Sequence, residues 1–103
     1  MTEVGAWAEL QKGNHIRGGE WIETRILSSG PRTNPWFQEC GPRIMKEGDI
    51  LAYDTDMVGP YGYCADLSRT FKIGDGKPTD AEREAYQGAY EQIQNNMQLL
   101  KPG

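Results

Sequence analysis

The chain has 103 residues, of which 25% are charged and 37% hydrophobic, and its 11 Lys and Arg against 15 Asp and Glu give a net charge of −4. This length allows one domain at most, or part of one. A mild acidic excess without basic clusters argues against a nucleic-acid-binding protein, and no apolar run approaches the roughly 18 residues that a membrane span requires.

The start of the chain lacks the basic residues and apolar stretch of a secretion signal, so we expect a cytoplasmic protein. Its two cysteines, Cys40 and Cys64, fit that compartment as reduced thiols, although a disulfide between them is possible in principle. With a single histidine, His15, and no C-x-x-C spacing, the ordinary zinc frameworks are excluded.

The first predicted element is a short helix over residues 3–12. Val4, Trp7 and Ala8 share one face of it, and Gly13 can supply a left-handed stop. We expect His15 at the surface near the end of this helix.

The next elements are strands. Residues 21–28 are rich in aromatic and β-branched side chains and predict one strand. The connection over residues 30–48 carries Trp36 and Phe37 between prolines, so it should pack against the protein or line a pocket. Two further strands are predicted over residues 50–58 and 63–73.

The last element is a helix introduced by a capping box, in which Thr79 and Glu82 each satisfy a backbone N–H. It carries an apolar stripe with steps of four and three residues. The stripe consists of Tyr86, Tyr90, Ile93, Met97 and Leu100. Such a stripe is core packing, and we expect a sheet or another helix to cover it.

Three aspartates converge in the predicted hairpin. Asp54 and Asp56 project from the same face of their strand, because residues i and i+2 point the same way. If residues 59–62 form the connection, positions whose numbers sum to about 122 face each other, which sets Asp66 opposite Asp56. Directly opposed like charges destabilise a sheet.

Something must offset this repulsion, because the neighbouring strand residues are mostly apolar and uncompensated charge is expensive there. Protonation of one carboxylate and a bound cation are the two remedies, and we favour the cation. The alternative is that some of these aspartates are edge or turn residues exposed to water.

From residue 28 to the end, the chain resembles the first half of the pita-bread domain shared by methionine aminopeptidase, prolidase, aminopeptidase P and creatinase. Short segments in a fixed order and spacing carry the resemblance: Ser28 to Gly30, Gly48 to Leu51, Asp54 with Asp56, Gly62 to Phe71, and Leu100 to Gly103. The resemblance implies an α+β fold, the N-terminal half of a pita-bread domain, with an antiparallel sheet covered by helices and residues 1–103 as a single partial domain.

The resemblance also implies a metal site. Metal-dependent members of this family draw two aspartates of a two-metal centre from the corresponding strand pair, and these fall on Asp66 and on one or both of Asp54 and Asp56. The family further implies a homodimer for the full-length protein.

Two departures point to one branch of the family. Pro35-Trp36 stands where the peptidases have a Pro-His pair, and Asp54 and Asp56 together offer an extra carboxylate. Both features, with residues 21–39, resemble the DddP-type lyases, which split dimethylsulfoniopropionate into dimethyl sulfide and acrylate. The resemblance implies a divalent metal, two ions with iron favoured and manganese, zinc or cobalt as alternatives.

The sulfonium group of that small-molecule substrate is a soft cation that favours an aromatic face. Trp36, with Trp21 or Tyr63 as neighbours, could supply one; the alternative for Trp36 is a loop tryptophan packed on the sheet. Arg69 is expected to balance carboxylate charge. No residue is identified as the general base.

Family members complete the site with a His and two Glu from later strands, and residues 1–103 hold no such set. We therefore expect a metal-dependent lyase in the full-length parent and an inactive chain 1–103. The alternatives are a metallopeptidase acting on Xaa-Pro peptides and a creatinase-like or non-catalytic binding protein that uses no metal.

Overall fold

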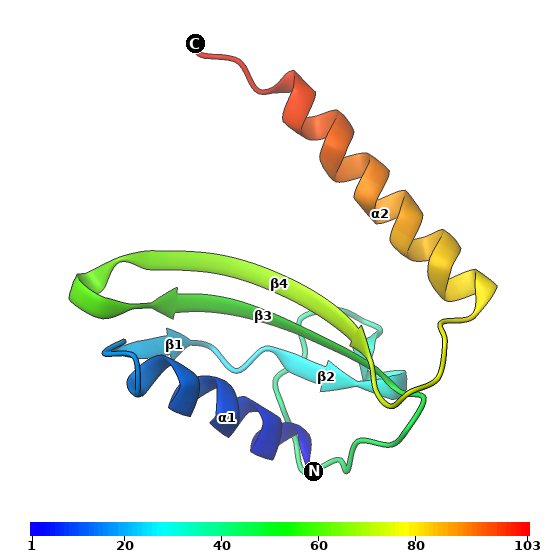
Figure 1. The fold of residues 1–103 in the computed structure, drawn as a ribbon, viewed down its shortest axis with the longest axis horizontal. Coiled ribbons are helices and arrows are strands. Elements are labelled where there is room, and N and C mark those ends of the chain that lie inside the picture. Colours follow the sequence, from blue (N-terminus) through cyan, green and yellow to red (C-terminus); the bar gives the residue numbers. More distant parts are fainter.

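The computed structural model describes residues 1–103 and contains one antiparallel sheet of four strands with two α-helices. One helix lies against the sheet and the other projects away from it (Figure 1). The elements are α1 (Glu3–His15), β1 (Trp21–Glu23), β2 (Leu27–Ser29), β3 (Ile50–Val58), β4 (Cys64–Lys72) and α2 (Asp80–Leu99). This α+β arrangement confirms the predicted fold class.

Helix α1 is longer than predicted and buries a different face. Thr2 caps its start by accepting a hydrogen bond from the N–H of Gly5 at 3.0 Å. The left-handed glycine beyond its end is Gly18, at φ +82°, rather than Gly13. Of the predicted face only Trp7 is buried. The other two buried residues of α1 are polar, Glu3 and Asn14. Both form hydrogen bonds, and a hydrophobic pattern does not indicate such residues.

The predicted strand over residues 21–28 is interrupted. Glu23 pairs with Asp56 and Leu27 pairs with Tyr53, so three residues on one side face two on β3. One extra residue in a ladder is a β-bulge, and Thr24 accommodates it at φ +61°. Because the bulge shifts the alternation by one, Ile22 and Leu27 both face α1 although they are five positions apart.

The core lies between α1 and one face of the sheet. Its buried apolar side chains are Trp7, Ile22, Leu27 and Cys40, with Leu51, Tyr53 and Met57 of β3 packed against them. Cys40 and Cys64 are free thiols. The alternate residues of β3, Asp54 and Asp56 among them, therefore point to the opposite face.

Helix α2 begins at the predicted capping box, with Thr79 and Glu82 satisfying each other's backbone N–H groups. Its apolar stripe, however, is not covered. Tyr86, Tyr90, Ile93 and Met97 are between 51% and 66% exposed, and the helix stands away from the sheet (Figure 1). The expectation of a sheet covered by helices is thus met on one face only. Neither α-helix has the length and apolar character needed to cross a membrane.

Candidate metal centre

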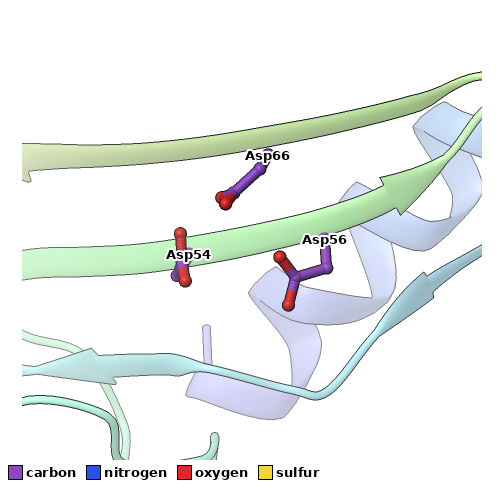
Figure 2. Close-up of side chains that lie close together, drawn as sticks. All are labelled: Asp54, Asp56 and Asp66. Atoms are coloured by element: carbon purple, nitrogen blue, oxygen red, sulfur yellow. The ribbon is translucent and has the colours of Figure 1, made fainter. Parts of the chain in front are cut away.

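The three aspartates lie together on one face of the hairpin formed by β3 and β4. The two strands pair as predicted, with Asp56 directly opposite Asp66. Figure 2 shows Asp54 and Asp56 on β3 and Asp66 on the neighbouring β4, with their carboxylates close together. One carboxylate oxygen from each residue lies within 4.8 Å of the others.

The electrostatics of the group follow from this proximity. The negative charge of Asp54, followed by partial desolvation and the charge of Asp56, raises the pKa of Asp66 above its ordinary value. None of the three forms an ion pair with a lysine or arginine side chain. The repulsion inferred from the sequence is therefore present and is not neutralised by a neighbouring basic side chain.

The donor set fits a hard divalent cation. Carboxylate oxygens are the ligands that such cations prefer, and one from each of the three residues lies within 4.8 Å of the others. Asp54 and Asp56 are half-buried and Asp66 is exposed, so an ion could reach the group from solvent. The arrangement can bind a cation that polarises an oxygen of a ligand.

Two neighbours of the aspartates were not singled out by the sequence. Ser68 lies opposite Asp54, and its hydroxyl donates a hydrogen bond to Asp54 Oδ1 at 2.5 Å; the rule that placed Asp66 opposite Asp56 also predicts this pair. Glu23 pairs with Asp56 across β1 and β3, so it adds an acidic residue to the same face. No signal indicated Glu23, because the pairing of residues 21–23 with β3 is long-range.

Arg69 does not balance the aspartate charges as expected. Its guanidinium donates to the backbone carbonyl of Ser68 at 2.7 Å. Neighbouring residues of a strand point to opposite faces, so Arg69 cannot share the face of Asp66 and Ser68.

The three aromatic residues predicted to bind substrate are not neighbours. Trp36 lines a groove of about 550 Å³ together with Ser68, the hydrogen-bond partner of Asp54, and with residues of α2. This confirms that the connection over residues 30–48 lines a pocket. Trp21 pairs with Val58 at the other end of β3, and Tyr63 precedes β4 at that same end. The aspartates therefore lie between Trp36 and the other two.

Comparison with known proteins identifies close relatives. The chain is 55% identical over 102 residues to the dimethylsulfoniopropionate lyase DddP of Roseovarius nubinhibens, which covers 99% of the chain and 23% of that protein. It is 57% identical over 101 residues to the lyase of the same name from Roseobacter denitrificans, covering 98% of the chain and 23% of that protein. The chain thus spans about a quarter of the length of these relatives.

A more distant similarity reaches a peptidase. The Xaa-Pro aminopeptidase of Escherichia coli is 36% identical over 59 residues, which are 57% of the chain and 13% of that protein. The sequence pattern of metallopeptidase family M24 matches residues 1–103. The antiparallel sheet, the aspartate hairpin and this match over the whole chain together place the protein in metallopeptidase family M24, the pita-bread family.

Proposed function

We propose that the full-length protein containing these residues is a metal-dependent lyase that splits dimethylsulfoniopropionate into dimethyl sulfide and acrylate. The observation that carries this proposal is the identity of 55% and 57% to two lyases of this name over nearly the whole chain. Identity at this level includes the hairpin that bears the aspartates.

Within this proposal the aspartates hold the metal. Asp54, Asp56 and Asp66 offer three carboxylates within 4.8 Å, and a divalent ion bound there would act as a Lewis acid toward a substrate oxygen. We propose iron as the ion, because the resemblance is to lyases that use it. Manganese, zinc and cobalt are the alternatives.

Trp36 is proposed to contact the sulfonium group. Its side chain is 39% exposed and borders the same groove as Ser68, the hydrogen-bond partner of Asp54, so an aromatic face is available there for a soft cation. Trp21 and Tyr63 remain candidates at the other end of the hairpin.

The family suggests further properties of the full-length protein. We propose that it is a homodimer, as the resemblance implies. We also propose a cytoplasmic location, which is supported by two cysteines that are both free, as is usual in a reducing compartment.

A peptidase acting on Xaa-Pro peptides is the second candidate. It is favoured by the 36% identity over 59 residues to an Xaa-Pro aminopeptidase. Against it stands Trp36, because an indole cannot accept a hydrogen bond or a proton at the place where the peptidases carry a histidine.

The decisive experiment assays the full-length protein, loaded with iron(II), for dimethyl sulfide by gas chromatography. We expect dimethyl sulfide and acrylate in equal amounts, and none from the Asp66→Ala variant, which should also retain less metal by elemental analysis. Absence of product from metal-loaded wild-type protein would refute the lyase. Cleavage of Xaa-Pro dipeptides instead would establish the peptidase, and equal metal content in the two proteins would exclude Asp66 as a ligand.

A further inference from the structure

Ser68 is the side-chain hydrogen-bond donor to the aspartate group. It lies on β4 directly opposite Asp54 on β3, and its Oγ donates to Asp54 Oδ1 at 2.5 Å. Of the three aspartates, only Asp54 accepts a hydrogen bond from a side chain. A hydroxyl bound to a carboxylate forms a short and strong hydrogen bond.

This hydrogen bond restricts the orientation of Asp54. A carboxylate has two oxygens, each with lone pairs that can accept a hydrogen bond or ligate a metal. The hydrogen bond from Ser68 restrains the position of Oδ1 relative to β4, and Oδ2 is not bonded to Ser68. Asp66 lies on the same strand as Ser68 and two residues before it, so the two side chains point to the same face.

A neutral donor has an advantage in this position. A lysine or arginine in place of Ser68 would neutralise a carboxylate and compete with a cation, whereas a hydroxyl orients Asp54 and leaves its charge in place. The adjacent cationic residue, Arg69, bonds to the carbonyl of Ser68 instead. Hydrogen-bonded neighbours of this kind hold metal ligands in place, and their removal typically lowers metal affinity about 10- to 100-fold.

We propose that Ser68 is a positioning residue of the metal centre, which orients Asp54 for a cation shared with Asp56 and Asp66. This inference rests on the proposed function, in that it requires the three aspartates to bind a metal. It adds a residue outside the ligand set that determines how well the set binds.

The test measures cobalt(II) binding by the full-length, metal-free protein, using calorimetry and the visible absorption of the bound ion. Ser68→Val and Ser68→Thr form a matched pair, because both are β-branched residues suited to a strand and only threonine keeps the hydroxyl. We expect Ser68→Val to weaken cobalt(II) binding about 10- to 100-fold and to alter the absorption spectrum, and Ser68→Thr to restore both.

Two controls separate positioning from folding. Thr70 lies on the same face of β4 as Ser68, two residues further from Asp66, and opposite Ala52. Thr70→Val removes its hydroxyl and should leave cobalt(II) affinity unchanged. The thermal midpoints of the metal-free Ser68 variants should agree, since Ser68 is exposed. Equal cobalt(II) affinity of the valine and threonine variants would overturn the role of Ser68 alone. If the wild-type protein binds no cobalt(II), the proposed metal centre is refuted, and so is the proposed metal-dependent function.

Discussion

At the scale of single residues, Glu3 is the least expected feature of the fold. Its side chain is fully buried, and both oxygens of its carboxylate accept hydrogen bonds. Oε1 accepts from the N–H and hydroxyl of Ser29 at 2.8 and 2.7 Å, and Oε2 accepts from the N–H of Gly41 at 2.9 Å and from Arg32. One side chain thereby ties α1 to β2 and to the connection that carries Trp36.

Removing the charge of Glu3 should destabilise the protein. We expect Glu3→Gln to lower the free energy of unfolding by about 1.5–3 kcal/mol, the range for one hydrogen bond to a charged group, because Arg32 loses its carboxylate partner. Urea unfolding measures the difference. The control is Glu9→Gln on the same helix, which breaks only an exposed pair with Lys12 and should change stability by no more than about 1 kcal/mol.

The same residue predicts a dependence on pH. Burial of Glu3 disfavours its charge, but the hydrogen bonds from Ser29, Gly41 and Arg32 outweigh it and hold the pKa of Glu3 below its ordinary value of 4.5. A folded-state pKa below the unfolded one stabilises the protein above the unfolded value, and this contribution is lost as the pH falls through the folded value. The difference in free energy of unfolding between the wild-type protein and Glu3→Gln should be largest at pH 7 and should decrease as the pH falls below 4.5. A difference that stays constant or increases in acid would contradict a lowered pKa of Glu3.

At the scale of elements, the hairpin and α2 follow local rules while the strand before them does not. The pairing of β3 with β4 and the start of α2 are as the sequence predicts, because each depends on residues close together in the chain. The interruption between β1 and β2 depends on α1, which requires both Ile22 and Leu27 on its side. The resulting bulge lies opposite Asp54 and Thr55, beside the candidate metal centre.

The capping box of α2 gives a prediction at this scale. Thr79→Ala removes the acceptor of the hydrogen bond from Glu82 N–H, 3.2 Å long, and the loss of an N-cap typically costs about 1 kcal/mol. We therefore expect the amides in the first turn of α2 to exchange with deuterium about fivefold faster, which is the equivalent of 1 kcal/mol. Mass spectrometry of the full-length protein measures this. Thr79→Ser keeps the acceptor and should exchange at the wild-type rate; equally fast exchange in both variants would exclude a capping role.

At the scale of the whole molecule, residues 1–103 form an open structure. Their accessible surface is 7554 Å², whereas a folded monomer of this mass exposes about 5,800 Å². The radius of gyration is 15.5 Å, against about 13 Å for a compact domain of this length. Exposed residues are concentrated on β4 and along α2, which stands away from the sheet (Figure 1).

This openness predicts the behaviour of the chain alone. Within residues 1–103 the group consists of three carboxylates, and Asp66 is exposed to water, so we expect no release of dimethyl sulfide from the isolated chain. Gas chromatography under the conditions used for the full-length protein tests this. Measurable turnover by residues 1–103 would show that the three aspartates suffice, contrary to the half-site inferred from the resemblance.

The sequence by itself determined the hairpin, its register, the aspartate group and the cap of α2, because each arises from alternation, turn geometry or hydrogen bonds between near neighbours. It also indicated the family, through the order and spacing of its motifs. Only the tertiary structure decided the bulge at Thr24, the burial of Glu3 and the separation of Trp36 from Trp21. These depend on contacts between distant segments, where packing against α1 and satisfaction of buried polar groups override the local pattern.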